Sequence, residues 1–269
     1  MRKTYVKSVL LFSLFALVAT SCTLISSAGF TSKGLPTPEV PKNLISTIGN
    51  SSVNLDHSGW TKLLQKHVDT NGDVNYKAFK NDQKELDTYL NMLSENKPDN
   101  TWSVQELLAY YINLYNAYTV DLILKNYPLQ SIKDISGPWT KAIVPVGDVM
   151  MSLGGIEHSI LRKMNEPRIH FAINCASFSC PKLLNEAFTA EKINEQLDRI
   201  TREFINSDKN NISEESAQLS SILDWYEKDY LVHGIGSLRE YVNQYSDIKI
   251  REGAKITFED YNWNLNEQK

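Results

Sequence analysis

The residues of this 269-residue chain best suited to chemistry are two cysteines. Cys175 and Cys180 are separated by Ala-Ser-Phe-Ser, and Pro181 follows directly. A loop of this length can bring the two Cα atoms within the roughly 4.4–6.8 Å that a disulfide requires, and in an oxidising compartment a disulfide is the default outcome. The alternative is that one thiol is a nucleophile with a base in hydrogen-bond reach. Cys180 is then the weaker nucleophile, because Pro181 supplies no backbone N–H for an oxyanion.

Polar residues elsewhere in the chain supply candidates for that base and for the group that orients it. His158 and His170 are the nearest histidines in sequence. The catalytic hypothesis takes Cys175 as the nucleophile, His158 as the base, and Glu157 or Asn116 as the orienting group. The remaining polar candidates, taken as binding residues, are Arg162, Arg168, His170, Asn113 and Asn174.

Each of these residues also has a structural explanation. Asn113 and Asn116 share one helix face, where a buried amide either bonds to neighbouring loop backbone or orients a catalytic group. Arg162, one turn after His158, either binds an anion with it or pairs with a buried carboxylate. The cysteines and histidines match no ordered zinc spacing, so we expect no metal and no cofactor.

The elements that must position these residues can be read from the hydrophobic pattern. Ser103 is expected to cap the longest helix, over 104–126, which is apolar around most of its circumference and therefore central and buried. Further helices are expected over 60–68, 76–93, 156–164, 190–207, 222–230 and 238–245, and strands over 142–153 (a hairpin around Gly147-Asp148), 168–174, 248–251 and 255–258. The fold class is therefore α+β: a helix-rich single domain with a small, mainly antiparallel sheet.

The N-terminus has the pattern of a bacterial lipoprotein signal peptide. Three basic residues precede an apolar run over 9–18, and small or polar residues stand directly before Cys22. The run is too short to cross a bilayer as a helix. We expect a signal peptide over 1–21 that resembles a loose lipobox, with Cys22 lipidated, palmitate included, so that the protein is anchored to a membrane.

Residues beyond Cys22 divide into two parts. The stretch over 22–53 begins with serines, glycines and prolines and is expected to form the lipidated end and a flexible tether. Residues 54–269 contain no repeat and are expected to form one globular domain. The predicted location is the bacterial cell envelope, with the outer membrane favoured, on its periplasmic or surface side.

Composition and charge exclude several classes of protein. The chain is 42% hydrophobic and 22% charged, which excludes a disordered chain and a multi-span membrane protein. Its net charge is −4, and loss of three basic residues with the signal peptide leaves 25 basic against 32 acidic residues, or −7. A nucleic-acid partner is excluded on this ground, because such binding requires a basic face.

Four ordered motifs resemble one known family. They lie at 111–117, 152–162, 167–181 and 261–266. Over roughly Leu63 to Asn266 the sequence is similar to the domain of unknown function family 547, found in bacterial envelope proteins and in larger eukaryotic proteins. The resemblance implies boundaries and fold but no established reaction. It places the candidate site residues within family motifs, although Asn262 stands where the family tends to have Asp.

Two functions remain open from the sequence. The first is a membrane-anchored, cysteine-dependent hydrolase or acyl transferase, in which Cys175→Ala abolishes activity and spares the fold. The second is a non-catalytic binding or scaffolding module in which Cys175 and Cys180 form a structural disulfide. Removing that bridge would cost roughly 2–4 kcal/mol of stability.

Overall fold

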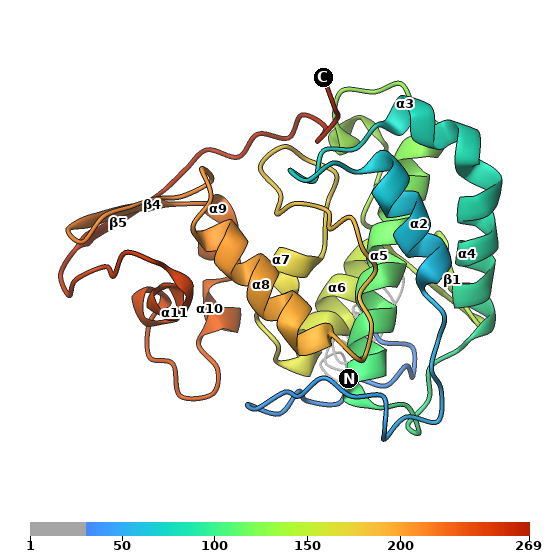
Figure 1. Cartoon of the computed structure of the whole chain (residues 1–269), viewed down its shortest axis with the longest axis horizontal. Helices are drawn as coiled ribbons and strands as arrows, with labels where there is room; N and C mark the ends of the chain where they lie inside the picture. Colours follow the sequence, from blue (N-terminus) through green and yellow to red (C-terminus); the bar gives the residue numbers. More distant parts are fainter. Residues whose placement is uncertain (1–30) are drawn as a thin grey trace, which may run out of the picture.

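Helix α5 (Val104–Asn126) runs through the centre of the molecule (Figure 1). Ser103 begins it as predicted, because its Oγ accepts the backbone N–H of Glu106 at 3.1 Å. Nearly all of its side chains are buried, which follows from a helix with apolar residues on every face. The computed structural model describes residues 31–269, so the predicted signal peptide and Cys22 lie outside the described residues.

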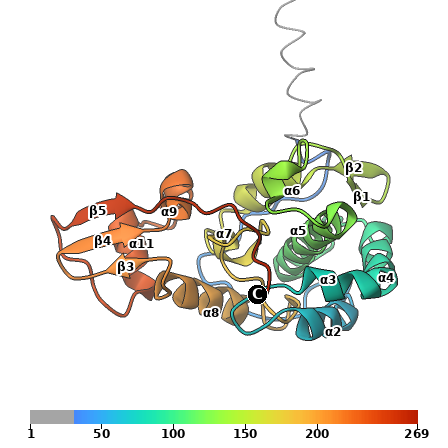
Figure 2. The ribbon, with the colours of Figure 1, turned by 90° about the horizontal axis from the view of Figure 1, so that it is seen from above.

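Other helices cover α5 on both sides (Figures 1 and 2). On one side lie α2 (Ser58–His67), α3 (Tyr76–Phe79) and α4 (Gln83–Glu95); on the other lie α6 (Leu153–Ser159) and α8 (Ile193–Ile205), with α7 (Ile169–Ala172) packed on α8. Short 3-10 turns occupy Lys80–Asp82, Ile132–Asp134 and Leu161–Met164. The hydrophobic core is continuous through both sides of α5.

The strands form two small sheets. β1 (Val144–Val146) and β2 (Val149–Met151) make the predicted antiparallel hairpin, and Gly147 at its turn adopts a φ of +57°, which favours glycine. The second sheet has the order β3 (Asn211–Ile212), β4 (Ser216–Leu219), β5 (Lys255–Phe258), with an antiparallel and a parallel pair. It lies at one end of the molecule, together with α9 (Ser221–Trp225), α10 (Glu227–Tyr230) and α11 (Leu238–Tyr245) (Figure 2).

This architecture confirms the predicted α+β, helix-rich class with small sheets. Two strand predictions are wrong. Residues 168–174, whose polar and apolar residues alternate, contain the helix α7 instead. The alternation misleads because His170 and Asn174 are both buried and hydrogen-bonded rather than turned to solvent. Residues 248–251 form no strand either; Arg251 donates its N–H to the carbonyl of Glu214 at the edge of the second sheet.

The segment before α2 differs from the flexible tether predicted up to residue 53. Leu35, Val40 and Leu44 are buried in the core. The hydroxyl of Tyr111 on α5 donates to the carbonyl of Pro36 at 3.1 Å, and Val40 donates its N–H to Met164 at 2.8 Å. Apolar residues before, between and after the prolines therefore dock this segment on the domain. No helix among residues 31–269 has the length and apolarity needed to cross a bilayer.

The C-terminal segment joins the two halves of the domain. After β5 the chain runs back to the vicinity of α3 (Figure 2). On the way, Phe178 and Ser179 donate backbone N–H groups to the carbonyls of Asn264 and Asn262 at 2.7 and 3.2 Å. The segment thus pairs with the loop that carries both cysteines, and this pairing positions the residues described next.

Candidate active site

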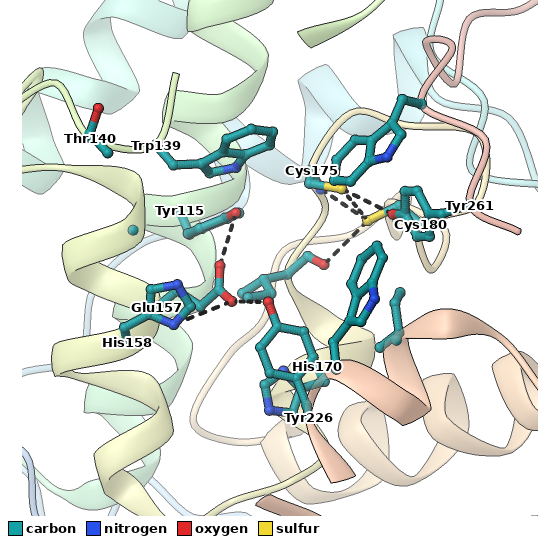
Figure 3. Close-up of a pocket in the computed structure, with 15 residues that line it drawn as sticks. Tyr115, Trp139, Thr140, Glu157, His158, His170, Cys175, Cys180, Tyr226 and Tyr261 are labelled. Atoms are coloured by element: carbon teal, nitrogen blue, oxygen red, sulfur yellow. Dashed lines mark hydrogen bonds and ion pairs between the residues drawn. The ribbon is translucent and has the colours of Figure 1, made fainter. Parts of the chain in front are cut away.

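A cavity of about 460 Å³ opens between α6, α9, the cysteine loop and the C-terminal segment (Figure 3). Aromatic rings supply most of its wall. The lining residues are Tyr115, Trp139, Thr140, Gly154, Glu157, His158, His170, Ile173, Cys175, Cys180, Ile222, Trp225, Tyr226, Tyr261 and Trp263. The cavity therefore collects five of the residues singled out from the sequence, Cys175, Cys180, Glu157, His158 and His170, and is the default candidate for a small-molecule site.

Three side chains converge on the sulfur of Cys175. The Cys180 Sγ lies 3.1 Å away, the Ser177 Oγ 3.1 Å and the Tyr261 Oη 3.3 Å. The two hydroxyls also lie 2.7 Å from each other. Each hydroxyl has one proton, so a consistent arrangement has one hydroxyl donating to the other, and the second donating to the sulfur. Such a chain strengthens the hydrogen bond at its end.

These contacts favour a thiolate on Cys175. The hydrogen bond with Cys180 lowers the pKa of Cys175 below its ordinary value of 9.0; burial opposes this, and Ser177 and Tyr261 reinforce it. Glu157 acts in the opposite direction through its charge. For Cys180, burial raises the pKa well above the ordinary value, and its hydrogen bond to Cys175 adds to the effect. The pair therefore contains one nucleophilic sulfur and one proton-bearing sulfur.

Asn174 fixes the loop on which Cys175 sits. Its side-chain oxygen accepts the N–H of Ala176 at 2.8 Å, and its side-chain nitrogen donates to the carbonyl of Pro181 at 2.7 Å. Ala176 has a φ of +57°, a left-handed conformation that disfavours a residue with a Cβ. A strained residue beside a candidate nucleophile persists because the surrounding hydrogen bonds hold it. Asn174 is thus a positioning residue and does not contact the pocket.

The two helix amides also hold backbone. Asn116 donates to the carbonyl of Ala172 at 2.9 Å and accepts the N–H of Asn174 at 2.8 Å. Asn113 does the same for Phe188, at 2.8 and 3.0 Å. Both amides are fully paired this way, so Asn116 carries the cysteine loop instead of orienting His158, and Asn113 does not reach the cavity.

Glu157 is the buried carboxylate of the cavity. Its two oxygens accept hydrogen bonds from the hydroxyls of Tyr226 at 2.5 Å and Tyr115 at 3.4 Å. The His158 Nδ1 lies 3.7 Å from Glu157 and accepts from Arg162 at 3.2 Å, because a guanidinium can only donate. Glu157 is therefore next to His158, as the catalytic hypothesis requires. Figure 3 shows His158 on the far side of Glu157 from Cys175, so it is not placed to take a proton from that sulfur.

A partly buried cluster of charged residues lies beneath Tyr226. Asp229 accepts from Arg162 at 2.5 and 2.9 Å and lies 2.9 Å from the Nε2 of His170. Burial alone would raise the pKa of Asp229, but the hydrogen bonds from His170 and Arg162 hold it below its ordinary value. Burial lowers the pKa of His170, whose ring stacks on Tyr226 with centroids 4.0 Å apart. Arg162 and His170 therefore position Tyr226.

Arg168 has no place in the cavity. Its guanidinium binds Glu166 through two hydrogen bonds of 2.8 and 2.7 Å, and Asn194 through a third at 2.9 Å. This pair ties the residues before α7 to the start of α8. Arg168 is thus a structural ion pair, and the interpretation of it as a binding residue is not supported by its position.

Several functional residues were missed from the sequence. Tyr261 and Ser177 contact the Cys175 sulfur, and Tyr226 and Tyr115 contact Glu157. Ser177 and Tyr261 lie inside the recognised motifs, which is the one signal that pointed to them. Tyr226 lies 69 residues from Glu157, and no local pattern predicts that contact. In residues 31–269, no group of three or more His, Cys, Asp or Glu side chains is arranged to hold a metal ion.

The fold and this cavity define a class of protein: a helix-rich α+β domain in which a loop with two cysteines is hydrogen-bonded to the central helix and lies beside an aromatic pocket. Residues 100–205 match the model of the family described as Protein of unknown function, DUF547. The match includes α5, α6 and the cysteine loop, and Tyr261 lies beyond its end. No curated protein and no solved structure matches the chain.

Proposed function

We propose that this protein is a cysteine-dependent enzyme of acyl transfer, a hydrolase or an acyl transferase, with Cys175 as its nucleophile. The observation that carries the proposal is the convergence of two hydroxyls and a second thiol on the Cys175 sulfur at the wall of an apolar cavity. Hydrogen bonds that lower the pKa of a thiol raise its thiolate fraction at a given pH, so the sulfur can react without a histidine base beside it.

The reaction follows from the arrangement of the cavity. The Cys175 thiolate attacks the carbonyl carbon of a bound ester, thioester or amide, a C–S bond forms, and the bond to the leaving group breaks. The leaving group takes a proton from water as it departs. Water, or a second acceptor, then attacks the acyl-thioester and loses a proton to solvent; a C–O bond forms, or a bond to the acceptor, and the C–S bond breaks to regenerate the Cys175 thiolate.

The non-catalytic alternative requires the sulfur atoms of Cys175 and Cys180 to be joined in a disulfide. A structural disulfide between Cys175 and Cys180 would consume the thiol that the reaction needs. Both residues are free thiols, joined by a hydrogen bond. The burial of Cys180 fits either a structural disulfide or a thiol that keeps its proton. The two functions are therefore separated by testing whether Cys175 becomes acylated.

The test is acylation of the full-length protein, with Cys22 changed to Ser, by a panel of activated acyl esters and thioesters. Intact mass should show one acyl group per chain, mapped to Cys175, and hydroxylamine should remove it. Cys180→Ser should still be acylated, whereas Cys175→Ser should not. Failure of every acyl donor to modify natively folded protein, or equal labelling of the two cysteines, would overturn the proposal.

We further propose that the domain is held at the bacterial envelope through lipidated Cys22. The support is the sequence pattern before Cys22, together with the docking of Leu35, Val40 and Leu44 on the domain. Only 12 residues then separate Cys22 from Leu35 (35 − 22 − 1), which span at most about 43 Å. The cavity would therefore lie near the membrane surface. The mass of the mature protein tests this: a diacylated Cys22 is expected, and cleavage elsewhere would contradict it.

A further inference from the structure

We infer that the cavity takes a substrate carrying an organic cation, such as an alkylammonium group, bound by Glu157 and the aromatic wall. This inference rests on the proposed function for the carbonyl that Cys175 attacks, and adds the chemical class of the rest of the substrate.

The charges around the cavity point to a cation. Of the residues lining it, Glu157 is the single carboxylate, and Lys, Arg and Asp are absent from that lining. Glu157 is 7% exposed, and the one ion-pair partner described for it within 4 Å is His158, which is charged only if protonated. The Tyr226 and Tyr115 hydroxyls that contact it are neutral. A buried carboxylate surrounded by neutral donors has charge left to pair with a ligand.

The cations next to the cavity do not neutralise Glu157. Arg162 lies on the Tyr226 ring at 5.2 Å, but both oxygens of Asp229 already bind its guanidinium. Lys133 lies over Trp263 at 5.0 Å and is not part of the lining. A thiolate on Cys175 adds a second negative group at the opposite wall.

The aromatic residues provide the second half of a cation site. Trp139, Trp225, Tyr261 and Trp263 form one connected ring cluster, with centroid distances of 4.5 to 5.9 Å. Ring faces attract a desolvated alkylammonium ion through their quadrupole, and tryptophan does so best. Trp225 is 47% exposed and stands at the mouth. Rings and one buried carboxylate together select a cation that is itself largely apolar.

The experiment compares thiol reagents that differ in charge. The trimethylammonioethyl, methyl and sulfonatoethyl methanethiosulfonates are cationic, neutral and anionic. Each transfers its thioalkyl group to the thiolate, forming a mixed disulfide and releasing methanesulfinate. Rates of modification at Cys175 are measured in the full chain with Cys22→Ser, and in the same chain with Glu157→Gln. Glu106→Gln is the matched control, because Glu106 is a buried carboxyl outside this cavity.

The expected result is a cationic-to-anionic rate ratio that falls about tenfold in Glu157→Gln and stays unchanged in Glu106→Gln. An unchanged ratio in Glu157→Gln would overturn the inference, even if Cys175 reacts rapidly and the proposed function stands. If Cys175 reacts with none of the reagents, the proposed function fails, and the inference of a cation site is then tested by ligand binding alone. Tryptophan fluorescence titrated with choline and with its neutral isostere 3,3-dimethylbutan-1-ol should then show at least tenfold tighter binding of choline; equal binding would contradict the inference.

Discussion

The sulfur atoms of Cys175 and Cys180 lie 3.1 Å apart, yet their surroundings favour opposite protonation states. Hydroxyls from Ser177 and Tyr261 reach the Cys175 sulfur, whereas Cys180 is buried and is followed by a proline that offers no N–H. The proton shared by the pair is therefore held on Cys180. This asymmetry makes one cysteine a candidate nucleophile and the other its donor.

Tyr261→Phe should weaken the nucleophile without unfolding the protein. Removing the phenol hydroxyl removes its hydrogen bonds to the Cys175 sulfur and to the Ser177 hydroxyl, so the pKa of the Cys175 thiol should rise towards its ordinary value. Alkylation of Cys175 should fall about three- to tenfold at pH 6.5 and be unchanged above pH 9.5, consistent with a change of about 0.5–1 pKa unit. Tyr241→Phe is the control, because within residues 31–269 that buried hydroxyl has no partner. Equal loss at both pH values would indicate a steric cause and count against this account.

Asn174→Ala should destabilise the cysteine loop. The change removes the bonds to Ala176 and Pro181 and leaves a buried N–H and a buried carbonyl unpaired, at an expected cost of about 2–4 kcal/mol in urea unfolding. Asn174→Asp keeps the acceptor for Ala176 and loses the donor to Pro181, so it should cost less. A loss below about 0.5 kcal/mol on the alanine change, which is close to the error of such a measurement, would show that the two hydrogen bonds are not needed.

His57→Asn should remove part of the protein's sensitivity to acid. Burial lowers the pKa of His57 from 6.5 to about 4. In the unfolded chain this histidine binds a proton below pH 6.5, whereas in the folded chain it stays neutral until the pH approaches 4. Stability is thus lost as the pH falls from 6.5 towards 4, by about 2.5 kcal/mol at pH 4.5. Asparagine can keep the hydrogen bond to Tyr89, made by the ring Nδ1 at 2.7 Å.

Urea unfolding at pH 7 and pH 4.5 measures that contribution. The loss of stability between the two pH values should be about 2 kcal/mol smaller in His57→Asn than in the parent protein. His233→Asn is the matched control, since His233 is exposed and has a φ of +54°, which asparagine tolerates. An equal acid loss in all three proteins would refute the role of His57.

Local patterns predicted much of the fold because they depend on neighbouring residues. The Ser103 cap, the uniformly apolar α5 and the Gly147 turn each depend on a few adjacent side chains. The strand predicted over 168–174 failed for a tertiary reason: His170 and Asn174 are polar but buried, and their partners, Asp229 and Asn116, lie 59 and 58 residues away. Alternation of polar and apolar residues reports exposure only where polar residues face water.

The candidate site was predicted in part. Cys175, Glu157 and His158 do share a cavity, and Asn116 and Asn113 bond to loop backbone, which was the structural alternative considered for them. The donors at the Cys175 sulfur were not foreseen. Tyr261 lies 86 residues from Cys175, and it arrives there because the C-terminal segment pairs with the cysteine loop. That pairing is made by backbone groups, which leave no mark on side-chain patterns.

The most direct test of the central claim is the pH dependence of alkylation at each cysteine in native protein, followed by peptide mapping. Cys175 should be alkylated with a midpoint below pH 9, and Cys180 should stay unmodified until strongly alkaline pH. Two cysteines that titrate together at their ordinary pKa, or a bridge that leaves neither thiol free before reduction, would contradict the assignment of Cys175 as the nucleophile.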